Sequence, residues 1–180
     1  VKAQLKKQNK QVLILQTRHT QHPGQLYGCN IENFDADVDA FFYIGDGMFH
    51  PKALVIQNQQ HCFWYNPHTQ KLQKITKEDI EIEIKKQNAA YSLFLMKTNI
   101  GVLITTKPGQ MQYTRALQLP EKFPDKKFYF FLQNDIDFNR LEDFPFIEVF
   151  VNTACPRLSY DDQVRHKLAV VDIDTITDIQ

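Results

Sequence analysis

The sequence has few cysteines and no excess of charge of either sign. Its three cysteines are odd in number and widely spaced, so they match neither a disulfide framework nor the paired CxxC pattern of a structural zinc site. Lysine plus arginine and aspartate plus glutamate each total 21, which gives a formal net charge of zero. A neutral chain lacks the electrostatic footprint of non-specific binding to nucleic acid or a membrane. We therefore predict neither as a partner.

Long apolar runs are also missing. None approaches the roughly 20 residues that cross a bilayer, and the first residues lack the apolar region and cleavage site of a signal peptide. These features predict a cytoplasmic protein. The 180 residues are nevertheless 43% hydrophobic and 12% aromatic, which is enough to form the core of one large domain or two small ones.

Short apolar segments bounded by turn signals recur along the chain, and several are continuous rather than alternating. Such runs are typical of strands in a parallel sheet whose two faces are both covered. Stretches of helix length lie between them, at residues 77–99 and 112–123. The alternation predicts an α/β fold with mainly parallel sheets. The predicted strands are residues 11–16, 39–47, 63–67, 100–106, 127–133 and 147–152, whereas residues 53–57 fit either a strand or a helix that begins near Pro51.

The two halves of the chain share a short sequence pattern, an echo that ends in Pro-Gly-Gln. QVLILQTRHTQHPGQ and GVLITTKPGQ both read as a strand, a polar loop and then Pro-Gly-Gln, with Pro23 and Pro108 in equivalent places. In each half a later strand ends in a short turn, YIGDG in the first and VNTACP in the second. We therefore expect two similar small α/β units, residues 1–85 and 86–180.

Ligands of open α/β sheets bind beyond the carboxyl ends of the strands. The segments predicted to lie there are residues 23–30, 44–51, 105–110 and 153–159. In the second of these, Asp46 suits either a helix cap in a tight glycine turn or a contact to a ribose or amino group. The third lacks the spacing of a nucleotide triphosphate loop, because Lys107 precedes the glycine.

Histidines and cysteines are the remaining candidates for metal ligands. His50, His61 and His68 are more typical of surface or core histidines. Cys29 and Cys155 differ from Cys62, because both lie in strand-end turns with small neighbours that let a bulky group approach the backbone. Two thiolates from separate units suit an iron–sulfur cluster. Cys62 lies within an apolar run and is predicted to be structural.

Several segments taken together resemble one family, the catalytic subunit of archaeal diphthamide synthase and its eukaryotic relatives. They are PGQLYGCN, DAFFYIGDGMFHPKAL, WYNPHTQKL, GVLITTKPGQ and VNTACPRLSYDD. They occur in the family's order and cover nearly the whole chain. The combination of GQxxGC, YIGDGxFH and ACPRLS is highly specific.

The resemblance implies three similar α/β domains, each of which donates one cysteine to a 4Fe–4S cluster. It also implies an atypical radical cleavage of S-adenosylmethionine, with transfer of a 3-amino-3-carboxypropyl group to a histidine of elongation factor 2. Here Cys29 matches the ligand of the second domain and Cys155 that of the third, whereas Cys62 matches none. Arg157 suits either the methionine carboxylate or a surface ion pair. The expected walls of the cofactor pocket are Gly45, Asp46, Gly47, Gly109 and Gln110.

The resemblance begins within the family's second domain, so the first domain and its cysteine have no counterpart here. We expect either a fragment or a chain whose partner supplies the missing domain and third cysteine, in a homodimer or heteromer. The alternative is a non-catalytic α/β module that docks on a partner synthase subunit or on elongation factor 2. No residue is assigned a catalytic role by the resemblance.

Overall fold

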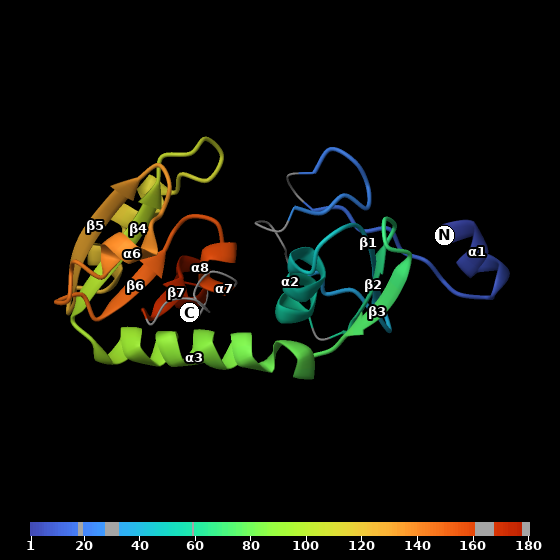
Figure 1. Ribbon diagram of the computed structural model, residues 1–180, viewed down its shortest axis with the longest axis horizontal. Helices are drawn as coiled ribbons and strands as arrows, with labels where there is room; N and C mark the ends of the chain where they lie inside the picture. Colours follow the sequence, from blue (N-terminus) through green and yellow to red (C-terminus); the bar gives the residue numbers. More distant parts are fainter. Residues whose placement is uncertain (18–19, 28–32, 59, 161–167, 178–180) are drawn as a thin grey trace. The chain divides into compact units, whose positions relative to one another are not determined.

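The computed structural model describes residues 1–17, 20–27, 33–58, 60–160 and 168–177. The chain divides into two compact units, Val1–Lys77 and Glu78–Gln180 (Figure 1). The boundary predicted near residue 85 lies within helix α3 (Glu81–Met96), which is continuous through that point. Ala90 and Phe94 of α3 are buried in the core of the second unit, so the whole helix belongs to that unit. None of the described helices is both long and apolar enough to cross a membrane.

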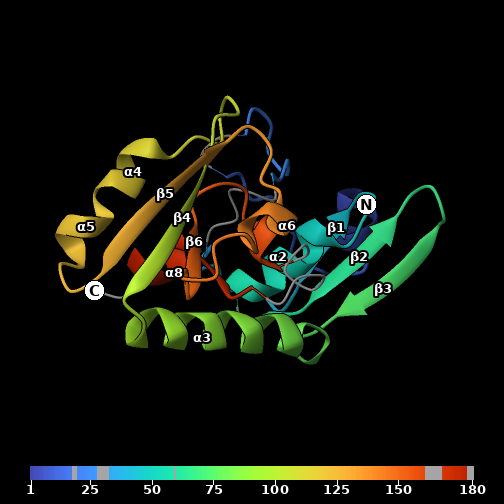
Figure 2. The same ribbon diagram turned by 60° about the vertical axis from the view of Figure 1, so that its left-hand side comes forward.

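The second unit contains a fully parallel sheet with the strand order β5-β4-β6-β7 (Figure 2). Its sequence predicted three of these strands, because their apolar runs are long and rich in β-branched and aromatic residues. The fourth, β7, was missed because it has only three residues. The strands are β4 (Asn99–Thr105), β5 (Lys127–Gln133), β6 (Val149–Asn152) and β7 (Val170–Asp172).

Helices cover both faces of this sheet, as its continuous apolar strands predict. One core cluster joins α3, α4, α5 and α8 to β4, β6 and β7, and a second joins α6 to the opposite face. The predicted helix at residues 112–123 is divided into two short helices. The bounds are η1 (Glu78–Ile80), α4 (Tyr113–Leu117), α5 (Leu119–Lys122), α6 (Phe138–Leu141), α7 (Arg157–Tyr160) and α8 (Ile173–Thr177).

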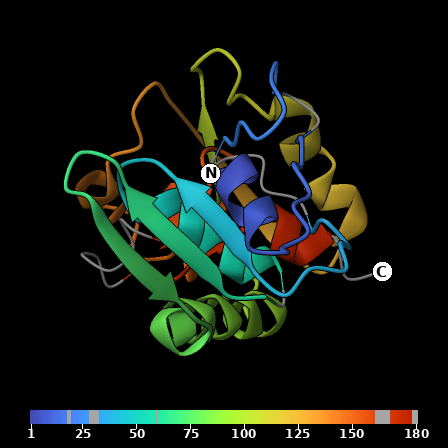
Figure 3. The same cartoon turned by 90° about the vertical axis from the view of Figure 1, so that its right-hand side faces the viewer.

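The first unit contains a smaller, mixed sheet (Figure 3). Strands β1 (Phe41–Ile44) and β2 (Cys62–Asn66) are parallel, and helix α2 (Phe49–Gln57) connects them. Residues 53–57 therefore adopt the helical alternative, with Pro51 in the first turn. Strand β3 (Lys71–Ile75) pairs with β2 in antiparallel orientation and was missed because it is largely polar. The short helix α1 (Lys2–Lys7) precedes these elements.

The strand predicted at residues 11–16 is wrong, because this segment belongs to no helix or strand. Leu13 and Ile14 are exposed rather than buried in a sheet. The carbonyl of Leu15 instead accepts a hydrogen bond at 2.7 Å from the N–H of Gly24. The backbone of this segment thus pairs locally with the following turn, and an apolar run alone does not create a strand without a neighbouring strand.

The Pro-Gly-Gln echo corresponds to the same turn in both units. The N–H of Gln25 donates to the carbonyl of His22, and the N–H of Gln110 donates to that of Lys107, each at 3.1 Å. The intervening glycines, Gly24 and Gly109, have φ of 80° and 79°. Proline followed by a residue with positive φ is the arrangement of a type II turn, which explains why glycine occupies both positions.

Candidate functional site

The strand order of the second unit places a topological switch point between β4 and β6. From β4 the chain passes to β5 on one side and then crosses to β6 on the other. In doubly wound sheets ligands bind at the carboxyl ends of the two strands where the order reverses. The segments that follow β4 and β6 are residues 105–110 and 153–159, and both were predicted to lie at strand ends. Cys155, Arg157, Gly109 and Gln110 therefore belong to one edge of this sheet.

Hydrogen bonds to both β4 and β6 hold the turn that carries Cys155. The N–H and hydroxyl of Thr153 both donate to the carbonyl of Leu103 in β4, at 3.1 and 2.8 Å. The N–H of Ala154 donates to Oδ1 of Asn152 at 2.9 Å. Cys155 is partly exposed, and Pro156 leads into helix α7, where Arg157 is exposed. The thiol therefore lies in a well-fixed turn at the carboxyl end of β6, as its sequence context predicted.

Three buried polar side chains lie behind this turn and were not predicted. The Nδ2 of Asn152 donates to Oδ1 of Asp172 at 2.8 Å, and the hydroxyl of Ser159 donates to the same oxygen at 2.7 Å. Burial raises the pKa of Asp172 to about 7, although these two hydrogen bonds oppose the shift. The available sequence signal was a polar residue that ends each of two apolar runs, IEVFVN and LAVVD. Only the parallel pairing of β6 and β7 brings them together.

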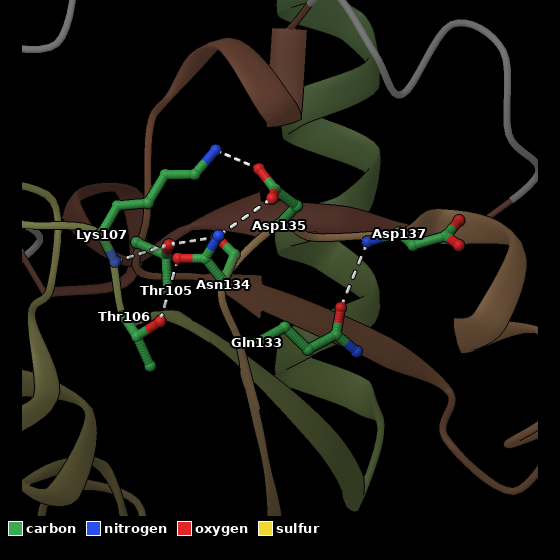
Figure 4. Close-up of polar contacts among 7 residues, drawn as sticks. All are labelled: Thr105, Thr106, Lys107, Gln133, Asn134, Asp135 and Asp137. Carbon is green, nitrogen blue, oxygen red and sulfur yellow. Dashed lines mark hydrogen bonds and ion pairs between the residues drawn. The ribbon is translucent and has the colours of Figure 1, made fainter.

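A second polar group, at the carboxyl ends of β4 and β5, fixes the start of the loop 105–110 (Figure 4). The hydroxyl of Thr105 donates to the carbonyl of Asn134 at 3.0 Å and accepts from the N–H of Lys107 at 3.2 Å. The ammonium of Lys107 forms an ion pair with Asp135, which lowers the pKa of that exposed carboxyl. Lys107 is thus held by the segment that follows β5, whereas Gly109 has open space around it.

The predicted pocket residues Gly45, Asp46 and Gly47 follow β1 in the first unit. The N–H of Gly45 donates to the carbonyl of Tyr65 at 3.1 Å, and its own carbonyl accepts from the indole N–H of Trp64 at 2.8 Å. A Cβ at Gly45 would lie 2.6 Å from the Tyr43 hydroxyl, so glycine allows the phenol ring to lie against this turn.

The glycine turn of the first unit is not a helix cap. Helix α2 begins at Phe49 with Met48 as the N-cap residue and has no side-chain cap, so the helix-cap alternative for Asp46 is wrong. Asp46 and Gly47 are exposed. Burial, followed by the charge of Asp46, raises the pKa of Tyr43. Tyr43 also stacks on His50, with 5.7 Å between the ring centroids.

The cysteines occupy different environments. Cys62 is fully buried in β2, and burial raises its thiol pKa to about 12. A thiol that resists deprotonation is a poor metal ligand, which agrees with the structural role predicted for it. Cys29 lies outside the described residues, so its placement remains a prediction. Within the described ranges, no three His, Cys, Asp or Glu side chains gather as a metal-binding group.

The second unit is therefore a doubly wound α/β unit with a cysteine at the edge where sheets of this type bind their ligands. A family model described as "Putative diphthamide synthesis protein" matches residues 1–173. The chain belongs to this family of diphthamide synthesis proteins, as the sequence motifs indicated.

Curated relatives carry the name of a synthase. The chain is 30% identical over 142 residues to the 2-(3-amino-3-carboxypropyl)histidine synthase of Pyrococcus horikoshii, a match covering 78% of this chain and 40% of the relative. It is 32% identical over 145 residues to subunit 1 of the synthase from Caenorhabditis elegans, a match covering 77% of this chain and 36% of the relative. The chain thus spans about two fifths of the length of these relatives.

The fold is similar to a solved structure that contains an iron–sulfur cluster. The crystal structure of Dph2 from Pyrococcus horikoshii with a 4Fe–4S cluster matches with a TM-score of 0.80 and 25% sequence identity. The match covers 99% of this chain and 53% of the Dph2 chain. This similarity confirms the α/β fold class.

Proposed function

We propose that this chain forms part of a 2-(3-amino-3-carboxypropyl)histidine synthase. The reaction is transfer of the 3-amino-3-carboxypropyl group of S-adenosylmethionine to a histidine of elongation factor 2, in diphthamide synthesis. The single observation that carries the proposal is Cys155, which lies in the turn after β6, beside the switch point of a fold that matches the cluster-containing Dph2 structure. Family membership and the names of the relatives support the same reaction.

The donor set of the chain fits an iron–sulfur cluster. Thiolates are the usual protein ligands of such clusters, and Cys155 combines a strand-end turn with partial exposure. Cys29 is the second proposed ligand, and a cysteine from another chain or domain would be the third. When bound, a 4Fe–4S cluster with three thiolate ligands supplies an open iron and the electron that cleaves a carbon–sulfur bond of the sulfonium.

Other residues of the chain would bind S-adenosylmethionine. Arg157 is exposed two positions after Cys155, and a guanidinium pairs bidentately with a carboxylate such as that of methionine. In the first unit, Trp64 and Tyr65 hold the backbone of Gly45. This hold leaves the exposed Asp46 carboxylate at the strand end, where it suits an amino group or a ribose hydroxyl.

The test reconstitutes the cluster anaerobically with iron and sulfide. The chain alone is expected to bind iron poorly, because two thiolates leave much of the iron coordination unfilled. Addition of a separately expressed first domain of the family, with its cysteine, is expected to restore cluster absorbance. Once a chemical reductant such as dithionite supplies an electron to the cluster, cleavage of S-adenosylmethionine is expected as well. Cys29→Ala or Cys155→Ala should then abolish both signals.

The matched control is Cys62→Ala, whose loss should leave iron binding unchanged because that thiol is buried in β2. Thermal unfolding of each variant separates loss of iron from loss of fold. A stable cluster with full turnover in the isolated chain would contradict the need for a third cysteine. Failure of the complemented chain to bind iron would favour the alternative, a non-catalytic module that docks on a synthase subunit or on elongation factor 2.

A further inference from the structure

A buried hydrogen-bond set joins three elements directly behind the Cys155 turn. It consists of Asn152 at the end of β6, Ser159 in α7 and Asp172 at the end of β7, and their exposed fractions are 1%, 2% and 6%. Burial of polar side chains is unfavourable unless their hydrogen bonds are satisfied. The three side chains contact one another through atoms 2.7–3.0 Å apart. The two hydrogens of Asn152 Nδ2 are shared among Asp172, Ser159 and the carbonyl of Cys155. A fully connected network of this kind fixes one arrangement of the elements that it joins.

The Asn152 amide connects this set to the backbone of the turn. Its Oδ1 accepts from the N–H of Ala154 at 2.9 Å, and its Nδ2 donates to the carbonyl of Cys155 at 3.0 Å. The same carbonyl also accepts from the N–H of Leu158 at 3.0 Å. Pro156 fixes its own φ and restricts the conformation of the residue before it. The backbone on both sides of Cys155 is thus held in one conformation.

Asp172 helps to fix which way the Asn152 amide faces. An asparagine amide has one acceptor oxygen and one donor nitrogen, and a half-turn about its terminal bond exchanges them. The Oδ1 of Asp172 accepts from Nδ2 of Asn152, so a flipped amide would place two oxygens against each other. The Ser159 hydroxyl donates to the same Oδ1 of Asp172 and holds the carboxyl in place. The carboxyl therefore reinforces the orientation that presents an acceptor to Ala154 and a donor to Cys155, which these two backbone groups also favour.

We propose that Asp172 is a positioning residue for Cys155, which acts through Asn152 to hold the turn in the geometry that presents the thiol to the cluster. The inference rests on the proposed function for the identity of the ligand, but the contacts that carry it belong to this chain alone. The side chains that bind a metal must be positioned to within roughly 0.5 Å, and hydrogen bonds from residues that do not touch the metal hold them there. Asp172 lies 17 positions (172 − 155) after the cysteine that it serves.

The test measures amide hydrogen exchange and thiol alkylation in the full chain without iron. Asp172→Leu removes the oxygen that accepts from Asn152. Asp172→Ser is a milder change, because its shorter side chain no longer reaches Asn152. Both should lower the protection of the Ala154 N–H by about tenfold or more, which corresponds to about 1.4 kcal/mol of lost local stability. The N–H of Thr153, which donates to the backbone of Leu103, should keep its protection. Alkylation of Cys155, followed by peptide mass spectrometry, should become several-fold faster.

Two controls separate positioning from general stability. Asp172→Asn keeps an acceptor oxygen, so both signals should stay within about threefold of the wild type. Leu119→Ala removes buried carbons from the same unit without touching the turn, so it should destabilise the fold and leave Ala154 and Thr153 equally affected. Unchanged Ala154 and Cys155 signals in both Asp172→Ser and Asp172→Leu would overturn the proposal. So would changes that Leu119→Ala reproduces.

A final experiment separates failure of the positioning role of Asp172 from failure of the proposed function. In the complemented and reconstituted protein, Asp172→Ser should take up less iron and change the electron paramagnetic resonance spectrum of the cluster, and Asp172→Asn should do neither. A loosened turn with wild-type iron content and spectrum would overturn the positioning role. If the wild-type complex binds no iron, the proposed function falls. The exchange and alkylation results then still decide whether Asp172 fixes the thiol.

Discussion

At the scale of single residues, Lys126 and Asp172 are the charged side chains whose burial has the clearest consequences in the second unit. The side chain of Lys126 is only 4% exposed, and its ammonium donates to the carbonyls of Leu95 and Lys97 at 3.1 and 3.0 Å. It also lies 5.1 Å from the ring centroid of Phe94. A cation at a helix C-terminus satisfies carbonyls that have no partner within the helix and complements the helix dipole. Lys126 thus anchors the end of α3.

Lys126→Met keeps most of the side-chain volume and removes the charge, so we expect it to lower the free energy of unfolding by about 1–2 kcal/mol. Urea denaturation followed by circular dichroism measures this change. Lys122→Met is the matched control, because Lys122 is exposed and its loss should cost less than about 0.5 kcal/mol. Equal effects of the two substitutions would contradict the anchoring role of Lys126.

Asp172 makes stability depend on pH. Burial raises its folded-state pKa to about 7, above the ordinary value of 3.8, so the folded chain binds the proton more tightly than the unfolded chain. Its contribution to stability is therefore fully present below pH 3.8 and is lost as pH rises through about 7. The slope is at most about 1.4 kcal/mol per pH unit, since one proton is involved.

Asp172→Asn removes this dependence, because an amide does not titrate. We expect the stability of the variant relative to the wild type to rise between pH 5.5 and pH 8.5. Urea denaturation at both values measures the difference, in which effects of pH common to both proteins cancel. A constant difference across this range would show that Asp172 is ionised throughout.

At the scale of secondary-structure elements, Gly101 controls how β4 and β6 pack. Gly101 of β4 pairs with Phe150 of β6 in the parallel register. A Cβ at Gly101 would lie 2.4 Å from Cδ1 of Phe150 and 3.0 Å from Cγ2 of Ile147. Glycine inside a strand often marks such a close approach. The missing side chain therefore allows the buried Phe150 ring to cover this part of the sheet.

Gly101→Ala is expected to destabilise the chain by about 1–3 kcal/mol through overpacking. Phe150→Leu should relieve the clash, so the double variant should be more stable than the sum of the two single effects predicts, by about 1 kcal/mol. Urea denaturation of the four proteins in the cycle measures this coupling. In the parallel cycle with Gly109→Ala, which has open space but a φ of +79°, the effects should add. Additivity in the Gly101 cycle as well would exclude the clash.

At the scale of the whole molecule, each unit has its own sheet and core. The second unit buries two apolar clusters on opposite faces of four parallel strands. The first unit has a three-stranded sheet, and its buried apolar side chains among the described residues are Phe41, Leu54, Val55, Cys62 and Ile75. Smaller domains bury a lower fraction of their surface, so their stability is lower.

We expect the fragment Glu78–Gln180 to fold by itself and to unfold cooperatively. Thermal unfolding by circular dichroism and the dispersion of its amide NMR spectrum measure this. The fragment Val1–Lys77 should show a lower midpoint, because it buries a smaller core. A second-unit fragment without a cooperative transition would show that its fold requires the first unit.

Local signals in the sequence account for much of the fold. The long apolar runs predicted β4, β5 and β6, because strand preferences act over a few residues. The repeated Pro-Gly-Gln was visible in the sequence, and the structure shows it to be the same turn at Gly24 and Gly109. The same locality explains the error at residues 11–16, where an apolar run has no neighbouring strand to pair with. It also explains the missed β7, whose three residues give too short a pattern.

The sequence by itself determined the α/β class, the family and the strand-end position of Cys155, because each depends on contiguous residues. The tertiary structure alone decided the strand order β5-β4-β6-β7 and hence the switch point beside that cysteine. It alone joined Asn152 to Asp172, and Lys107 to Asp135. These partners are far apart in the sequence, and no local preference specifies them. They meet because parallel strands bring their carboxyl ends to one edge of the sheet, where buried polar groups must find hydrogen bonds.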